Sequence, residues 1–131
     1  MAKTARVSQQ ACPCGGVSLA DCCGRFHNGS AIAQTAEQLM RSRYSAYVLG
    51  NDAYLQASWH AQTRPSEIVT DAALHWLGLE VRASKQDGDT ATVEFVARCR
   101  VDGRGQRLHE VSRFVREDGY WFYVDGSIQE K

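Results

Sequence analysis

The chain has 131 residues, of which 44% are hydrophobic and 23% are charged, and its 15 basic side chains balance its 15 acidic ones. This size and composition predict one ordinary globular core, and no apolar run approaches the roughly 18 residues that span a bilayer. Because the charges cancel, we expect neither nucleic acid nor a membrane as a partner. The N-terminus lacks the apolar stretch of a signal peptide, which predicts a cytoplasmic protein.

Four of the five cysteines lie within residues 11–29, after polar residues 1–10 that we expect to be disordered. They form two close pairs, Cys12 with Cys14 and Cys22 with Cys23. Structural zinc takes four thiolate or imidazole ligands in a tetrahedron. Adjacent cysteines reach one ion only at a turn or helix start, where side chains diverge by about 100°. The pattern predicts a zinc knuckle, with His27 as an alternative ligand to one of the vicinal cysteines.

Other chemistries compete for these cysteines. Disulfides are disfavoured in a chain without a secretory signal, and a redox site would need two residues between the cysteines beside a βαβ unit. An iron–sulfur cluster also takes four thiolates, and empty reduced thiols are a further alternative. An ion with four protein ligands has no open position, so we do not expect the metal to be catalytic. Cys99, in a separate segment, is expected to be a small core residue.

Residues 30–131 are predicted to form the main domain, which begins with three helices. The first spans 35–49, starts at a threonine N-cap with Gln38 as its capping-box partner, and ends before a glycine. The second starts at Asp52, and the third covers residues 66–76.

After these helices the hydrophobic period changes from helical spacing to alternation. The predicted strands begin at Leu79, Thr90, Gln106 and Tyr120, and the second, third and fourth end at Val101, Arg116 and Val124. Asp-Gly pairs mark the turns between them. Helices followed by a four-stranded meander make an α+β domain, with the helices packed on one face of an open, cone-shaped antiparallel sheet.

Two further expectations concern how these parts meet. Phe26 and Ile32 are expected to join the knuckle and the domain into one continuous core. Arg41 and Arg43 are expected to be solvated, with the knuckle or the mouth of a pocket as their alternative contact.

The cysteine segment resembles the SEC-C motif, a short zinc-binding element, and the likeness extends further along the chain. The additional matching segments are 41–48 (RSRYSAYV), 76–79 (WLGL), 112–114 (SRF) and 121–126 (WFYVDG). Together they resemble the uncharacterised YchJ family over residues 12–126. The resemblance implies a nuclear transport factor 2-like (NTF2-like) fold, an α+β cone. Seven residues separate the second and third cysteines, where SEC-C usually has eight.

A curved sheet closed by helices leaves a pocket, which is the default place for a ligand. The polar candidates for lining it are His60, Arg64, His109, Arg113, Tyr123 and Asp125. A histidine beside an aspartate can act as a general base, and paired arginines can hold a carboxylate. The competing interpretation is structural: Arg113 pairs with Asp125 or Glu110 across strands, and His60 closes a helix. Neither face of strand 107–115 is cleanly apolar, so the face toward the pocket stays open.

These observations support a zinc-binding, cytoplasmic binding or adaptor module with a small-ligand pocket. Because SEC-C elements resemble docking modules, a protein partner is expected at the knuckle. The alternative is an isomerase or dehydratase-type enzyme that uses His60 or His109 with Asp125, a hypothesis that depends mainly on fold analogy.

Overall fold

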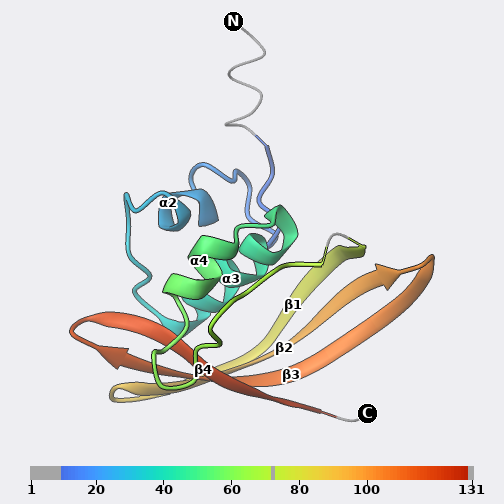
Figure 1. Ribbon diagram of the computed structural model, residues 1–131. Coiled ribbons are helices and arrows are strands. Elements are labelled where there is room, and N and C mark those ends of the chain that lie inside the picture. The colour runs from blue at the N-terminus through green and yellow to red at the C-terminus, as the bar shows by residue number, and fades with distance from the viewer. Residues whose placement is uncertain (1–9, 72, 130–131) are drawn as a thin grey trace, which may run out of the picture.

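The structure is a computed structural model that describes residues 10–71 and 73–129, so the disorder predicted for residues 1–10 lies outside the described residues except at Gln10. The helices are α2 (Cys23–His27), α3 (Ala36–Leu49) and α4 (Asp52–Ala57). The strands are β1 (Leu74–Asp87), β2 (Thr90–Val101), β3 (Arg104–Glu117) and β4 (Tyr120–Ile128). Figure 1 shows the helices over one face of a strongly curved sheet, with the cysteine segment on the far side of the helices.

The sheet is an antiparallel meander in the order β1-β2-β3-β4, which confirms the predicted topology. The second strand has the predicted bounds, whereas β1 starts five residues earlier than expected and β4 ends four residues later. The register shifts at Trp76/Gly78 and Val81/Ala83 in β1, and at Arg113/Phe114 between β3 and β4. Such irregularities bend strands, and they account for the strong curvature of the sheet. The curved sheet and the helices over it together form the α+β cone (Figure 1).

Helix α3 begins and ends as the sequence predicts. The Thr35 hydroxyl accepts a hydrogen bond from the Gln38 N–H at 3.1 Å, and Gly50 closes the helix with a φ of 73°. The Gln38 side chain departs from a capping box, because its oxygen accepts from the N–H of Gln34 instead. Helix α4 is capped in the same manner by Asn51, whose side chain accepts from the Tyr54 N–H.

The third helix predicted over residues 66–76 is wrong. In the described part of this range the chain is a loop up to residue 73, and Leu74 through Trp76 already belong to β1; Ala72 lies outside the described residues. The run Ile68-Val69-Thr70 is β-branched and favours extended backbone. Leu77, expected on the buried helical stripe, is instead an exposed residue at a bulge. Pairing with β2 therefore outweighs the weak helical pattern.

The core lies between α3 and the concave face of the sheet and continues into the cysteine segment. One buried cluster contains Cys12, Cys14 and Cys23 together with Leu39 and Phe114. Of the two expected bridging residues, Phe26 is buried in this cluster and Ile32 is 46% exposed. The knuckle is therefore packed against the domain through the face of α3 that points away from the sheet.

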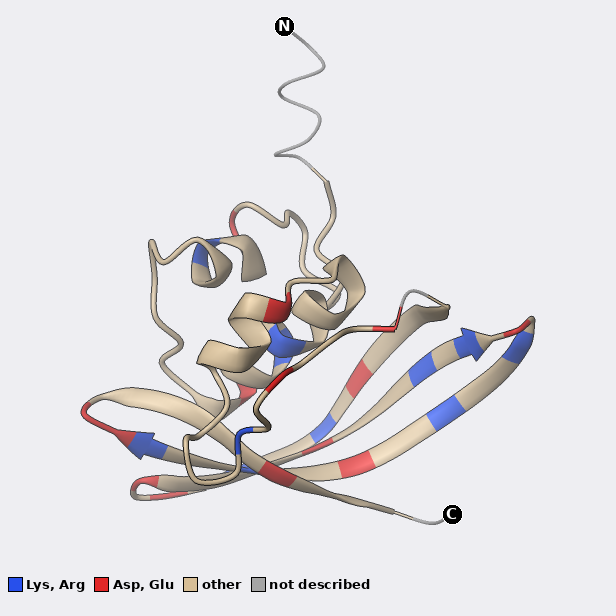
Figure 2. Cartoon of the chain, viewed as in Figure 1, with Lys and Arg blue, Asp and Glu red and all other residues tan. Residues whose placement is uncertain are grey.

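Charge on the surface is uneven despite the neutral total. Figure 2 shows basic residues gathered toward the turn between β2 and β3. These residues are Arg98, Arg100, Arg104 and Arg107, all of them exposed. Arg98 and Arg107 lie directly opposite each other in the strand register, an arrangement that like charges disfavour. Within the described residues, no helix combines the length and apolar character needed to cross a membrane.

Candidate metal centre and ligand pocket

The four clustered cysteines meet at one point. Their Sγ atoms all lie within 4.8 Å of one another, with 3.5 Å between Cys14 and Cys22 and 4.0 Å between Cys22 and Cys23. A tetrahedron with zinc–sulfur bonds of about 2.3 Å needs sulfur atoms roughly 3.8 Å apart. The donor set and its spacing therefore fit a tetrahedral zinc ion held by four cysteines.

The alternative ligand lies elsewhere. The His27 ring nitrogen Nε2 is 2.8 Å from the carbonyl oxygen of Ser42, and the ring packs against Tyr54 at 4.6 Å between centroids. The imidazole thus ties α2 to α3 and stays outside the group of four sulfur atoms.

Local backbone geometry explains how the sulfur atoms converge. Cys22 is the N-cap of α2 and Cys23 is its first residue, which is the helix start that vicinal ligands require. Gly16 provides the close approach: a Cβ at this position would lie 2.7 Å from the Cys22 sulfur. The seven-residue spacer therefore still closes the cage, although the SEC-C motif usually has eight.

Electrostatics show why the cage suits a cation. A hydrogen bond from Cys23 lowers the pKa of Cys14, burial raises the pKa of Cys22, and the hydrogen bond with Cys14 raises the pKa of Cys23. The first thiolate thus opposes ionisation of its neighbours. A divalent ion supplies the positive charge that allows all four thiols to ionise together.

Helix α3 supports the cage from outside. The Ser45 hydroxyl lies 3.4 Å from the Cys12 sulfur, and Arg41 donates to the carbonyl oxygen of Cys14 at 3.0 Å. Arg41 thus takes the knuckle contact that the sequence offered as an alternative. Outer partners of this kind orient metal ligands in known sites, and here one face of α3 contacts the cysteine cluster.

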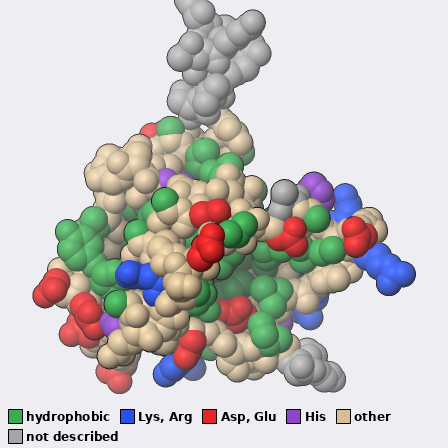
Figure 3. Space-filling view, in the orientation of Figure 1, with side chains coloured by type: hydrophobic (Ala, Val, Ile, Leu, Met, Phe, Trp, Pro, Cys, Tyr) green, Lys and Arg blue, Asp and Glu red, His purple; other side chains and the backbone are tan. Residues whose placement is uncertain are grey.

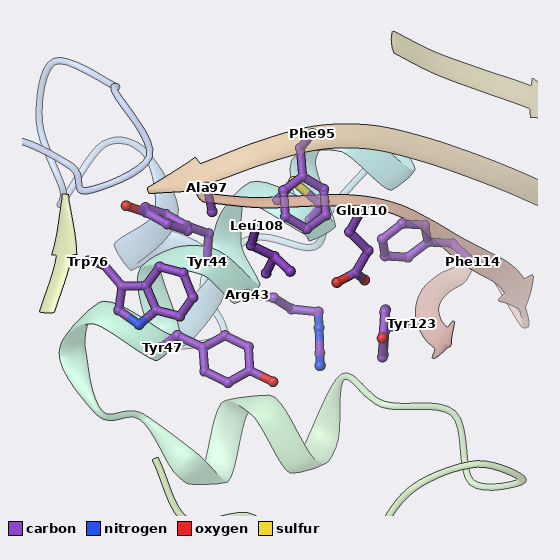
Figure 4. Close-up of a pocket in the computed structure, with 11 residues that line it drawn as sticks. Arg43, Tyr44, Tyr47, Trp76, Phe95, Ala97, Leu108, Glu110, Phe114 and Tyr123 are labelled. Carbon is purple, nitrogen blue, oxygen red and sulfur yellow. The ribbon is translucent and has the colours of Figure 1, made fainter. Parts of the chain in front are cut away.

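The opposite face of α3 covers a cavity of about 260 Å³ above the sheet. Figure 3 shows hydrophobic side chains gathered in the hollow between the helices and the strands. Figure 4 shows the side chains around the cavity, which come from α3 and all four strands. Most are aromatic: Tyr44, Tyr47, Trp76, Phe95, Phe114 and Tyr123. Two lining residues carry charge, Arg43 from α3 and Glu110 from β3.

Arg43 is only 5% exposed. Its Nη1 donates to the carbonyl oxygen of Leu55 at 2.9 Å and to the hydroxyl of Ser58 at 2.6 Å. Its guanidinium lies 4.4 Å from the ring centroid of Tyr123 and 5.1 Å from that of Trp59. Burial lowers the pKa of Arg43, and no carboxylate in the described part of the chain forms an ion pair with it.

Glu110 is half-buried and held in place. Its Oε2 accepts from the Ser112 hydroxyl at 2.7 Å, and a side chain at Gly126 would overlap its carboxylate. Burial, and then the negative charge of Glu110, raise the pKa of Tyr123, so this phenol stays neutral. Leu108, Glu110 and Phe114 line the cavity, which identifies the strand face that the sequence left open.

Of the six residues predicted around the pocket, Tyr123 lines this cavity and five lie outside it. His60 contacts Glu117 at 2.8 Å, and His109 contacts Glu94 at 2.7 Å. Arg64 donates to the backbone oxygen of Trp59.

The remaining two predicted residues are paired with each other on the outer face of the sheet. Arg113 donates two hydrogen bonds of 2.6 Å to Asp125. Arg113 thus has one of the two cross-strand partners that the structural interpretation named, and each predicted histidine contacts a glutamate instead of Asp125.

Of the two charged residues that line the cavity, Arg43 was expected to be solvated, with the mouth of a pocket as its alternative contact, and Glu110 was considered only as a cross-strand partner of Arg113. The expectation that Arg43 is solvated is wrong, because this side chain is buried. A signal for Arg43 existed: it lies three residues after Met40 and four before Tyr47, on the helical stripe that also carries Tyr44. A charge on an apolar stripe indicates burial. Glu110 had no comparable signal, because both faces of its strand mix polar and apolar residues.

The fold and site define a class of protein: an α+β cone with a cysteine knuckle docked on its longest helix. A family model described as the YchJ middle NTF2-like domain matches residues 35–126. A UPF0225 protein from Cupriavidus metallidurans is 55% identical over 126 residues, covering 91% of this chain and 89% of that protein. Another from Bordetella parapertussis is 57% identical over 127 residues, covering 93% and 96%. The chain belongs to this YchJ-like family.

Solved structures agree with the family. The solution structure of a SEC-C motif containing protein from Rhodopseudomonas palustris matches with a TM-score of 0.83 and 32% identity, covering 92% of this chain and all of that one. The crystal structure of a sec-c motif containing protein from Psychrobacter arcticus matches with a TM-score of 0.79 and 29% identity, covering 96% and 86%. The NTF2-like α+β fold expected from the resemblance is confirmed.

Proposed function

We propose that this protein is a cytoplasmic small-molecule binding module in which a structural zinc ion secures the helix that covers the binding cavity. The observation that carries the proposal is Arg43, a buried charge at the wall of a 260 Å³ cavity that has no ionic partner among residues 10–71 and 73–129. Ligand pockets are typically about 300–1,000 Å³ and combine apolar walls with a few fixed polar groups. This cavity lies near the lower limit and suits a small ligand.

The zinc centre supports this function through α3. Four thiolates fill the coordination sphere of zinc, so the ion stabilises the fold and has no open position for catalysis. Ser45 and Arg41 contact the cage, while Arg43, Tyr44 and Tyr47 line the cavity. A reducing compartment keeps the four thiols available for the metal, which favours the cytoplasm.

The enzyme alternative has less support from the geometry. Asp125 pairs with Arg113, and His60 and His109 each contact a glutamate away from the cavity. A general base must lie within hydrogen-bonding reach of a bound substrate. The histidine and aspartate that this alternative requires therefore do not come together at the cavity.

The test uses the full chain purified without added metal. Native mass spectrometry should find one zinc ion per chain, and ligand-observed NMR with a mixture of small acids, amines and neutral aromatics should find binders. Leu108→Trp places a larger side chain in the cavity, whereas Leu77→Trp changes an exposed residue of β1 outside it. We expect the first variant to lose binding and the second to keep it, with zinc retained in both. Equal binding by the two variants, or no binder at all, would overturn the proposal.

A further inference from the structure

The cavity has a charged end and an aromatic end. The Arg43 guanidinium lies 4.4 Å from the ring centroid of Tyr123, and Figure 4 shows the Glu110 carboxylate on the same side of the cavity. Tyr44 and Tyr47 pack against Trp76, with ring centroids 5.7 and 6.2 Å apart. In Figure 4 the Tyr47 hydroxyl points toward Arg43, and the carboxylate of Glu110 reaches in from β3. A molecule that fills the cavity meets polar groups at one end and ring faces at the other.

The positive charge of Arg43 at this end of the cavity would be complemented by an anionic group of a ligand. A guanidinium stays protonated and offers five N–H donors in a planar fork. Nη1 donates two hydrogen bonds, the Tyr47 side chain is a further hydrogen-bond partner of the guanidinium, and these partners and the flanking rings are all neutral. These contacts satisfy donors without cancelling the charge. A carboxylate would cancel the charge, and hydrogen bonds between a guanidinium and a carboxylate are stronger than those to neutral acceptors.

The negative charge of Glu110 at the same end would be complemented by a cationic group or a strong hydrogen-bond donor of a ligand. Glu110 forms no ion pair with Arg43, although both line one cavity, and Ser112 and Gly126 fix where its carboxylate lies. A simple carboxylic acid bound to Arg43 would meet this negative charge unpaired. A molecule that carries an ammonium group beside its carboxylate complements both residues.

We propose that the cavity binds a free α-amino acid with an aromatic side chain. Its carboxylate meets Arg43, its ammonium group meets Glu110, and its ring lies against Tyr44 and Trp76. This inference specifies the ligand class and depends on the proposed function, namely that the protein binds a small molecule in this cavity.

A matched set of probes separates the three requirements by isothermal titration calorimetry on the zinc-loaded full chain. L-Phenylalanine has all three groups, 3-phenylpropanoate lacks the amine, 2-phenylethylamine lacks the carboxylate, and L-alanine lacks the ring. Because each missing group leaves a partly buried partner uncompensated, we expect each of the three to bind at least about tenfold more weakly than phenylalanine. This comparison needs no change at Arg43, whose replacement affects folding.

Glu110→Gln tests the assignment of the ammonium group. This variant should lose most of the preference for phenylalanine over 3-phenylpropanoate, and Glu80→Gln, at an exposed glutamate of β1 outside the cavity, should keep it. If phenylalanine fails to bind, or binds within twofold of all three partial probes, the ligand class is wrong. Binding of other molecules that Leu108→Trp abolishes would then leave the binding module itself standing, whereas a chain that binds none of them would overturn both.

Discussion

The knuckle and the cavity lie on opposite faces of one helix, and they differ in how the chain builds them. The four sulfur ligands come from residues 12–23 and share one chemistry. The two charges of the cavity come from α3 and β3, far apart in the chain and opposite in sign. A metal centre built from one short segment is visible as spacing in the sequence. A pocket built by strand register and helix docking is visible only in three dimensions.

Removing the metal should give the largest effect. Replacement of Cys23 by alanine should cost at least about 3 kcal/mol, because a structural zinc contributes directly to folding free energy. Chelation should first remove amide protection from residues 11–29, with a smaller effect on 35–126, measured by hydrogen exchange. Cys99→Ala, at an equally buried cysteine outside the cage, should cost only about 1 kcal/mol. Loss of the whole fold on chelation would show that knuckle and domain are one folding unit.

The same contrast between local and long-range determinants explains which parts of the fold could be predicted from the sequence. The cap at Thr35, the Asp-Gly turns and the alternation over Thr90–Val101 are local, and the structure has them where they were predicted. The helix predicted over 66–76 failed because pairing between Leu74 and Val101, a distant partner, decides that segment.

The same limit applies to the candidate site. The cysteine spacing selected the four residues whose sulfur atoms meet at one point. Glu110 could not be selected, since its position depends on the register of β3 against Gly126 and on the docking of α3. His60 and His109 were plausible by residue type, but their partners are glutamates set by the fold.

Two arginines of α3 sharpen the comparison between its faces. Arg43→Met should destabilise the chain by about 1–3 kcal/mol, because the buried Leu55 carbonyl loses a charged donor. Arg41→Met should cost less, about 0.5–1 kcal/mol, because Arg41 is a third exposed and its ion pair with Glu37 is a helical surface pair, which leaves its hydrogen bond to the Cys14 carbonyl as the main loss. Urea unfolding of both variants in parallel measures the difference. Equal losses of unfolding free energy in the two variants would contradict the argument that the buried hydrogen bonds of Arg43 contribute more than the partly exposed contacts of Arg41.

Changes at the contact between Gly126 and the Glu110 side chain should have a smaller effect on the free energy of unfolding. Gly126→Ala should cost about 1–2 kcal/mol, because the added methyl group overlaps the Glu110 carboxylate. Combining it with Glu110→Ala should recover most of the loss, as a double-mutant cycle would show. Gly105→Ala is the matched control, since nothing lies near its added Cβ. Additive costs in the double variant would contradict the contact.

The smallest effect belongs to the charges that face outward. Arg113 donates two hydrogen bonds to Asp125 and thereby lowers the pKa of Asp125. A pKa depressed by folding contributes stability above the unfolded value of about 3.9, and this contribution is lost as the pH falls through the folded value. Both side chains are largely exposed, so solvent and salt screen the pair.

Asp125→Asn should therefore lower the urea midpoint slightly at pH 7. The two proteins should converge as the pH falls from about 3.9 through the depressed folded pKa of Asp125, or in about 1 M salt. A difference that persists in acid would assign the loss to packing. Convergence would show that the outer pair neutralises itself, in contrast to Arg43 and Glu110, which line one cavity and form no ion pair with each other.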